Sequence, residues 1–278
     1  MSAESLRRLP PELHERARAV AAGGVEVAEP RHAATVVLLR DGADGIEAYL
    51  LRRLGSMAFA GGMYVFPGGS VDPRDGDADI AWQGPPPAEW AAPLNADERL
   101  ARALVAAAVR ETFEESGVLL ATPYDAGNRE HWKTEQAALL DRSASMAEVL
   151  ARNGLVLRAD LLRPWAHWVT PEIEPKRFDT RFFVAALPEG QEPVHYRGES
   201  DHSEWMTPRD AVERHASGEL GMLPPTVFTL AELSAYDTVA GVLAAGERRD
   251  VKRVLPRIVV DGDDVLLLLP GDPGYPDD

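Results

Sequence analysis

The segment Asp97–Gly117, DERLARALVAAAVRETFEESG, constrains the fold more than any other stretch of this sequence. Asp97 or Asn95 is suited to be an N-cap and Gly117 to be a C-terminal stop, so the pattern predicts one helix. On a helical wheel its middle is apolar nearly all round, with leucine and alanine on one side. The other side carries Val105, Val109 and Phe113. We therefore expect a helix that is buried on more than one side.

Glu111, Glu114 and Glu115 share one face and continue the leucine and alanine stripe toward the helix C-terminus. Carboxylates in that position suffer desolvation and mutual repulsion, and they oppose the helix dipole. Arg110 can offset part of the charge through its i,i+4 relation with Glu114. A divalent cation can offset more, because oxygen ligands at i, i+3 and i+4 converge as Mg²⁺ requires. A solvated acidic helix end is the alternative interpretation.

The rest of the chain alternates short strands and helices without a regular βαβ repeat. We expect strands over 34–40, 46–53, 63–66, 161–169, 181–187 and 204–206, and a closing hairpin over 257–269. Further helices are expected over 130–153 and 226–245, and another begins after the Thr207 cap. Residues 70–95, with a proline triplet and scattered acids, are expected to be an irregular surface excursion. The fold class is accordingly α/β or α+β, a sandwich around a mixed β-sheet.

Charge and cysteine content narrow the function classes. The chain has 45 acidic and 29 basic residues, a formal charge of −16, which argues against nucleic acid and anionic membranes as partners. It has no cysteine, which excludes disulfides, thiolate metal ligands and a cysteine nucleophile and fits a cytoplasmic setting. Its longest aliphatic run, residues 265–269, is too short to cross a membrane.

The stretch GGMYVFPGGSVDP, residues 61–73, runs a short apolar strand straight into Pro67-Gly68-Gly69. A surface turn is one interpretation, because proline and glycine commonly end strands. The other is a backbone shaped so that its amides and carbonyls can approach an ion or a phosphate, which glycine permits.

The run RETFEESGV, residues 110–118, resembles the second half of the Nudix box, the signature of the Nudix hydrolases, and Phe66-Pro67-Gly68-Gly69 resembles its opening. The family spacing would place the arginine at about residue 83, whereas it is Arg110, 27 positions later. Counting back from Arg110, the first glutamate of the pattern falls on Arg102, so that position is unmatched, and Glu98 is a weak substitute.

A box split by an insertion resembles the acyl-CoA diphosphatase branch of the family, as do the fragments at residues 168–171 and 177–185. The resemblance implies a Nudix-type α/β/α sandwich in a single domain, residues 1–278. Its core would span about 31–215, the insertion about 70–96, and a C-terminal helix and hairpin extension about 216–278.

The resemblance also implies a reaction and its residues. The Gly68 carbonyl would bind Mg²⁺ or Mn²⁺ together with Glu111, Glu114 and Glu115, and Arg110 would hold a glutamate. The products would be 3′,5′-ADP and a phosphopantetheine. A further catalytic carboxylate is expected just before the Glu-Trp strand, with Glu199 first and Glu204 second.

The expected substrate is a small nucleotide diphosphate. Its phosphates would be bound by basic residues of the sequence, namely Arg52, Arg53, Lys176, Arg177 and Arg181. Trp165, Trp168 and Phe178 are candidates to stack an adenine, or else they are core residues. A pyrophosphatase of ADP-ribose, NADH or FAD and a non-catalytic ligand sensor are the alternatives, and the resemblance favours a homodimer.

Overall fold

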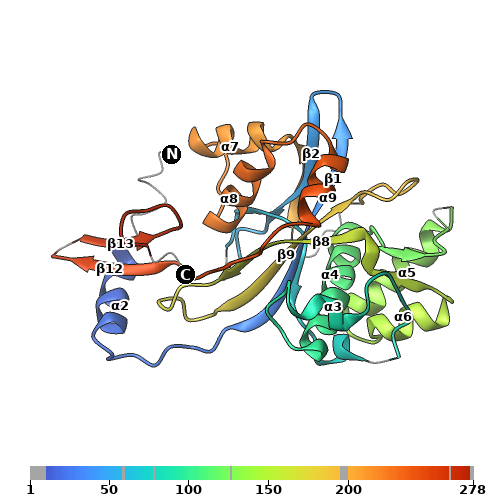
Figure 1. The fold of residues 1–278 in the computed structure, drawn as a ribbon, viewed down its shortest axis with the longest axis horizontal. Coiled ribbons are helices and arrows are strands. Elements are labelled where there is room, and N and C mark those ends of the chain that lie inside the picture. The colour runs from blue at the N-terminus through green and yellow to red at the C-terminus, as the bar shows by residue number, and fades with distance from the viewer. Residues whose placement is uncertain are drawn as a thin grey trace.

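The computed structural model describes residues 11–57, 60–77, 79–125, 127–194, 200–262 and 264–275. A mixed sheet crosses the centre of this part of the chain (Figure 1). Its strands, in spatial order, are β10 (Ser200–Met206), β2 (Gly45–Arg53), β1 (Arg31–Gly42), β9 (Phe178–Ala186), β8 (Leu162–Val169) and β11 (Arg253–Val254). Strand β1 is parallel to β9 and antiparallel to β2. The strands predicted over 34–40 and 46–53 are confirmed, and they form a hairpin.

Strand β1 is buried on both faces. Ala34, Val36 and Leu38 belong to one buried cluster, whereas Val37 and Leu39 belong to the other. Successive side chains of a strand point to opposite faces, so a nearly continuous apolar run fits a sheet that is covered on both sides.

Helices cover both faces, which confirms the predicted sandwich (Figure 1). On one side lie α3 (Pro87–Ala91), α4 (Glu98–Ser116), α5 (Arg129–Leu140) and α6 (Met146–Arg152). On the other lie α7 (Pro208–Ala216), α8 (Pro224–Leu233) and α9 (Val239–Gly246). A small sheet of β5 (Trp82–Gln83), β7 (Val156–Arg158) and β6 (Ala121–Thr122) adjoins the first group.

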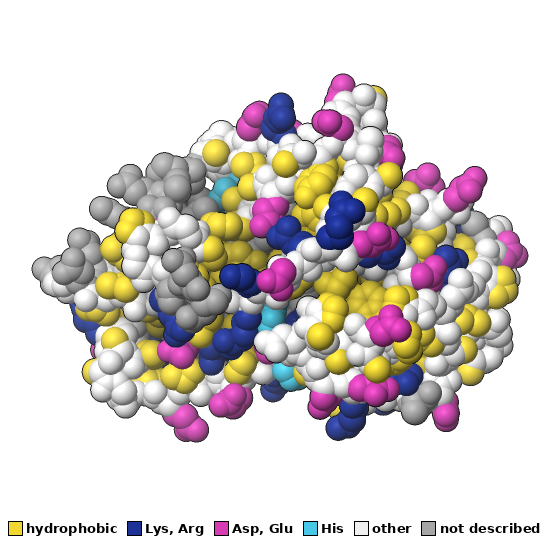
Figure 2. Space-filling model, viewed as in Figure 1, with side chains coloured by type: hydrophobic (Ala, Val, Ile, Leu, Met, Phe, Trp, Pro, Cys, Tyr) yellow, Lys and Arg dark blue, Asp and Glu magenta, His cyan; other side chains and the backbone are white. Residues whose placement is uncertain are grey.

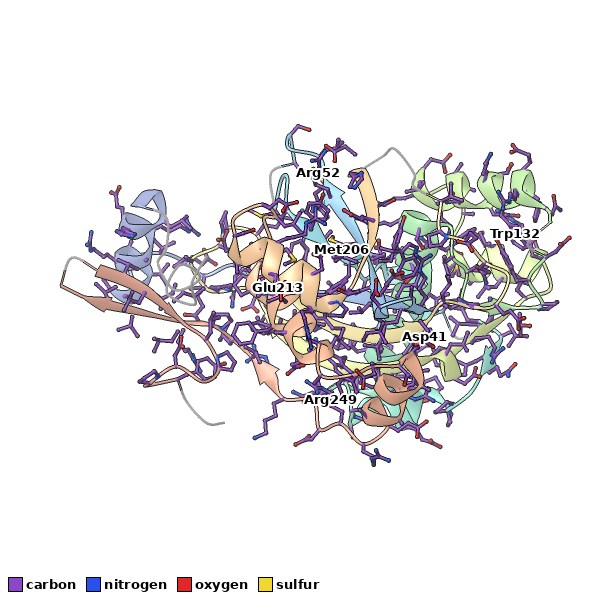
Figure 3. All side chains as sticks on the ribbon, turned by 90° about the horizontal axis from the view of Figure 1, so that it is seen from above. Asp41, Arg52, Trp132, Met206, Glu213 and Arg249 are labelled. Atoms are coloured by element: carbon purple, nitrogen blue, oxygen red, sulfur yellow. The ribbon has the colours of Figure 1, made fainter. Side chains whose placement is uncertain are left out.

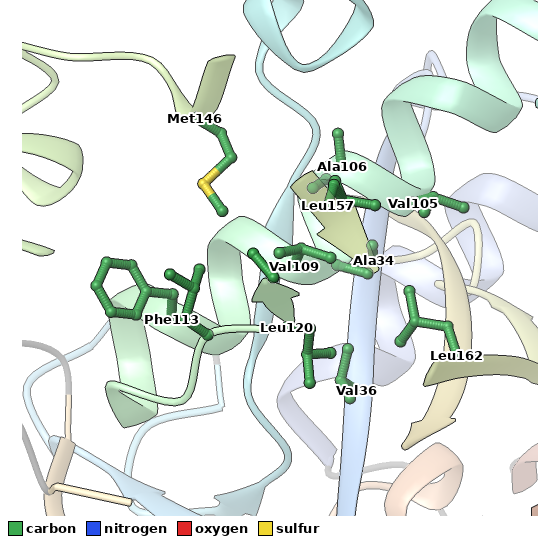
Figure 4. Close-up of a cluster of buried hydrophobic side chains, with 14 of the residues drawn as sticks. Ala34, Val36, Val105, Ala106, Val109, Phe113, Leu120, Met146, Leu157 and Leu162 are labelled. Atoms are coloured by element: carbon green, nitrogen blue, oxygen red, sulfur yellow. The ribbon is translucent and has the colours of Figure 1, made fainter. Parts of the chain in front are cut away.

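Helix α4 has the predicted ends and the predicted burial. The Asp97 side chain accepts a hydrogen bond from the Leu100 amide at 2.7 Å, and Gly117 ends the helix in the left-handed conformation, φ 70°. Residues 104–109 are all fully buried. Val105, Val109 and Phe113 belong to the buried cluster that α4 forms with the sheet and with α5 and α6 (Figure 4).

Two predicted helices are each divided in two. The expected helix 130–153 ends at Leu140, because Arg142 adopts a positive φ of 62° and Ser145 starts α6 with a capping box to Glu148. The expected helix 226–245 is interrupted in the same way, since the Thr238 side chain caps α9. In both cases an internal Ser or Thr acts as a new N-cap.

Residues 70–95 are not a simple surface excursion. They contain the 3₁₀ turn η1 (Pro73–Gly76), strand β5 and helix α3. Ile80, Trp90 and Leu94 are at most 5% exposed and join the α4 core. These widely spaced apolar residues lack a regular period, so they were not recognised as core positions.

The chain from Met63 onward forms β3 (Tyr64–Val65), which pairs with β2, and β4 (Gly68–Ser70), which pairs with β1. At the other end of the molecule α2 (Pro11–Ala21) packs on the predicted closing hairpin, β12 (Arg257–Asp261) and β13 (Asp264–Leu268) (Figure 1). Among the described residues, every helix is too short or too polar to span a bilayer.

Candidate active site

Residues 67–69, Pro-Gly-Gly, lead from β3 into β4, and we call them the glycine elbow. The elbow lies against β1 on one side and against the end of α4 on the other. Gly68 is paired with Thr35, and an added Cβ there would lie 2.4 Å from Thr35 Oγ1. A Cβ on Gly69 would lie 2.5 Å from Glu111 Oε1. Side chains at these two positions would collide with the strand or with the carboxylate. Glycine is therefore required for a close approach of backbone and acid.

The last turns of α4 present their glutamates to this elbow. The Gly68 amide donates a hydrogen bond to Glu115 Oε2 at 2.9 Å. Arg110 Nη1 donates to Glu111 Oε1 at 2.8 Å and to Glu114 Oε1 at 3.1 Å. The three carboxylates thus lie between one guanidinium and one main-chain amide. The metal-binding role predicted for the Gly68 carbonyl remains a prediction.

Arg110 makes five hydrogen bonds and so uses all of its N–H groups. Besides the two glutamates, it donates to Ser70 O and, from Nε and Nη2, to both carboxylate oxygens of Asp75, each at 2.9 Å. No donor is left for a substrate. The guanidinium therefore orients Glu111 and Glu114 through a fork that a lysine ammonium could not reproduce.

Asp75 is the site residue that the sequence analysis missed. Its carboxylate is 1% exposed and lies in η1, inside the segment expected to be surface. Counting back from Arg110 led to Arg102, which instead lies over the Trp82 ring, and Glu98 is three turns away at the helix start. Counting forward from Gly69, five residues intervene before Asp75, as the pattern requires. Asp75 therefore takes the place of the first acid of the box, and the insertion follows it.

Burial shifts the protonation of this cluster. Desolvation raises the pKa of Glu111 to about 7, although the charge of Arg110 acts in the opposite direction. Desolvation likewise raises the pKa values of Glu114 and Asp75 against the effect of Arg110. One guanidinium thus faces three carboxyl groups. The single positive charge of Arg110 does not balance three ionised carboxylates, so ionising all of them costs free energy.

This donor set fits a hard divalent cation in its chemistry, since carboxylate oxygens are what Mg²⁺ and Mn²⁺ bind. The carboxylates do not converge as closely as the helical wheel predicted. Among the described residues, no group of three His, Asp or Glu side chains is placed to hold a metal ion as it stands. One oxygen of each carboxylate is already engaged, by Arg110 for Glu111 and Glu114 and by the Gly68 amide for Glu115.

A cavity of about 1360 Å³ opens beside the cluster. Glu111, Glu114 and Glu115 line one part of it together with the elbow. Its wall continues over the sheet through β1, β8 and β9 and includes several basic and aromatic side chains, among them Arg31, Arg53, Lys176, Phe178 and Trp168. Figure 2 shows one face of the molecule, with Lys and Arg side chains across its middle next to exposed hydrophobic groups.

The predicted phosphate-binding arginines are not gathered in one place. Arg53 lines the cavity, whereas Arg52 lies at the surface and pairs with Asp201 at 2.7 Å (Figure 3). Arg177 donates to the carbonyls of Thr170 and Ala28. Arg181, which is 3% exposed, pairs with Asp179 and donates to the carbonyls of Leu94 and Asn95. Arg177 and Arg181 do not line the cavity, and their hydrogen bonds to main-chain carbonyls connect parts of the fold.

The other predicted groups also separate. Glu199 lies outside the described residues, although Ser200, which follows it, lines the cavity. Glu204 is held by Arg214 at 3.4 Å and is not a lining residue. Trp165 is fully buried and cannot stack a base, so only Trp168 and Phe178 of the three predicted aromatics reach the cavity.

Known proteins are similar to this chain in sequence and in fold. A family model described as the NUDT19 Nudix domain matches residues 98–233. The acyl-coenzyme A diphosphatase NUDT19 of Gallus gallus is 29% identical over 88% of this chain and 80% of its own length. The human protein of the same name is 28% identical over 85% and 74%. A crystal structure of a NUDIX hydrolase from Alicyclobacillus acidocaldarius is 31% identical, with a TM-score of 0.64 over 79% of this chain and 97% of that one.

Proposed function

Since the chain belongs to the Nudix hydrolase family, we propose that it is a divalent-metal-dependent diphosphatase that cleaves CoA or acyl-CoA to 3′,5′-ADP and the corresponding phosphopantetheine. The observation that carries the proposal is the acidic end of α4, packed against the glycine elbow beside a cavity of about 1360 Å³. The names of the relatives support the choice of substrate.

Glu111, Glu114 and Glu115, with the Gly68 carbonyl, are the residues that would hold the cation. A bound Mg²⁺ or Mn²⁺ would neutralise charge on the diphosphate and lower the pKa of an attacking water. For this, the carboxylates have to exchange part of their bonding with Arg110 and the Gly68 amide for the ion. The raised pKa of Glu111 implies that this exchange also displaces a proton from its carboxyl group near neutral pH.

The protein itself contributes positioning. Arg110 and Asp75 fix the direction of two glutamates, and the elbow fixes the third through the Gly68 amide. Phosphoryl transfer depends mainly on such positioning and on electrostatic stabilisation. Glu199 stays the first candidate for an additional catalytic carboxylate. Glu204 is the weaker one, because Arg214 already engages it.

The nucleotide half of the substrate is assigned to the part of the cavity lined by β1, β8 and β9. Phe178 and Trp168 offer ring surfaces there, and Lys176 lies 5.2 Å from the centre of the Phe178 ring. Arg31 is paired in register with Phe178 on the neighbouring strand and also lines the cavity. These groups suit an adenine base and the phosphates on its ribose.

The test is a hydrolysis panel of CoA, acyl-CoA, ADP-ribose, NADH and FAD, each assayed with Mg²⁺, with Mn²⁺ and with chelator, and with products separated by chromatography. The proposal expects the highest kcat/KM with CoA or an acyl-CoA, and release of 3′,5′-ADP only when metal is present. Preference for ADP-ribose, NADH or FAD would reassign the substrate within the same chemistry. Binding without turnover of any compound would favour a ligand sensor.

A further inference from the structure

The cavity has a second, apolar part beneath the connection between α7 and α8. We call it the methionine pocket, and it is bordered by Arg53, whose backbone pairs with that of Met63. The pocket itself is lined by Met63, Phe66, Met222, Leu223 and Pro224. None of these side chains carries a charge or a strong hydrogen-bond donor. The acidic cluster and the methionine pocket are parts of the same cavity, but they suit chemically different groups.

The α7–α8 connection is fixed directly on β3. The Tyr64 amide donates to the carbonyl of Gly221 at 2.8 Å. A Cβ added at Gly221 would lie 2.7 Å from Met63 Sδ. Phe66 and Met222, which are 3% and 4% exposed, belong to the same buried cluster. The chain beyond β10 thus completes a cavity whose acidic part is made by β4 and α4.

Strand β3 links the two parts of the cavity. Residues 63–68, which include β3, run from the methionine pocket to the elbow, a path of five residues that spans at most about 17 Å. That reach is comparable with an extended phosphopantetheine arm. A diphosphate held at the elbow can therefore place the thiol end of such an arm at the methionine pocket.

We propose that the methionine pocket binds the aliphatic acyl chain of the substrate, an inference that rests on the proposed function. A heterocycle is normally fixed by a few well-placed polar groups, whereas an alkyl chain needs none, and this lining offers none. Methionine side chains are flexible and adapt to chains of different length. Each buried methylene contributes about fourfold to binding, so a chain of several carbons would be selected strongly over a free thiol.

Met63→Gln tests the assignment, because it keeps the side-chain shape and places an amide in the pocket at a position that is only partly buried. The readout is the ratio of kcat/KM for acyl-CoA esters of increasing chain length to kcat/KM for CoA. We expect the ratio for medium and long chains to fall about tenfold or more, because the amide loses its hydration. Met57→Gln is the matched control, since Met57 is partly buried in the preceding loop and is not a lining residue.

Gly221→Ala provides a second and independent variant. Its methyl group pushes the flexible end of Met63, so we expect the longest chains to lose most. If CoA is hydrolysed and neither variant changes the chain-length ratio, the methionine pocket does not bind the chain, although the proposed function stands. If neither CoA nor any acyl-CoA is hydrolysed by the wild-type protein, the proposed function itself fails. An equal loss with CoA and with every acyl-CoA also contradicts the assignment.

Discussion

The bond between Asp75 and Arg110 gives the sharpest prediction, because both side chains are buried and the partner atoms are known. Asp75→Asn keeps the size of the side chain but turns an amide N–H₂ toward one of the two guanidinium N–H groups that the carboxylate accepts. Removing one partner of a buried ion pair costs about 3–5 kcal/mol. Arg110 keeps its bonds to Glu111, Glu114 and Ser70, so we expect the lower value, about 3 kcal/mol.

For a chain of this length, a loss of that size lowers Tm by about 6–12 °C. The measurement is urea unfolding and thermal melting in metal-free buffer, with Asp79→Asn as the control, because Asp79 is exposed in the same segment. Turnover should fall about 10- to 100-fold in addition, since the guanidinium no longer holds the glutamates in place. A free energy of unfolding within about 0.5 kcal/mol of wild type, the range of surface changes, would refute the reasoning.

Four further predictions concern the carboxylates. Glu114→Gln and Glu115→Gln should each lower turnover by orders of magnitude. In metal-free buffer the free energy of unfolding should stay unchanged or rise slightly, because each change removes a charge from the cluster. Near-normal turnover in both variants would contradict the proposed site. Gly69→Ala should displace the Glu111 carboxylate, which lies 2.5 Å from the new Cβ, and lower turnover at least about tenfold, whereas Gly55→Ala, in open space, should not. The folded-state pKa of Glu111, about 7, is above its ordinary 4.5, so the folded protein binds more protons in that interval. Stability should therefore be largest below the ordinary value and fall as pH rises through 7, and Glu111→Gln should remove this slope in urea unfolding; parallel slopes would show that another group is responsible. Metal binding near pH 7 should release protons, seen as buffer-dependent calorimetric heat, and Glu111→Gln should reduce that release.

The fold was largely predictable because its strongest elements have local signals. The apolar run of β1 and the capped, all-round apolar pattern of α4 both appear in the structure as expected. The wrong predictions concern segments whose structure depends on contacts with distant parts of the chain. Trp90 and Leu94 are core residues in a stretch with the composition of a loop, and the ends of α5 and α8 were set by caps inside apolar patterns.

The site was predictable on α4 and much less so elsewhere. Side chains at i, i+3 and i+4 of a helix are adjacent whatever the tertiary structure, so the glutamates were identified together. Whether an arginine faces a ligand or a main-chain carbonyl depends on distant parts of the chain. Arg181, for example, is bound by carbonyls 86 and 87 residues away in sequence. The cytoplasmic location and the homodimer stay predictions.

Asp75 and Arg110 meet across 35 sequence positions, and this has a consequence for finding similar enzymes. The reactive geometry depends on where the acid and the guanidinium return in space, not on how many residues separate them. Evolution can therefore lengthen or shorten the segment between η1 and α4, which here contains β5 and α3, while both ends keep their contacts. A genome search that requires one fixed spacing would miss such chains. A search for two separate motifs, one like residues 66–75 and one like residues 110–117, would find them.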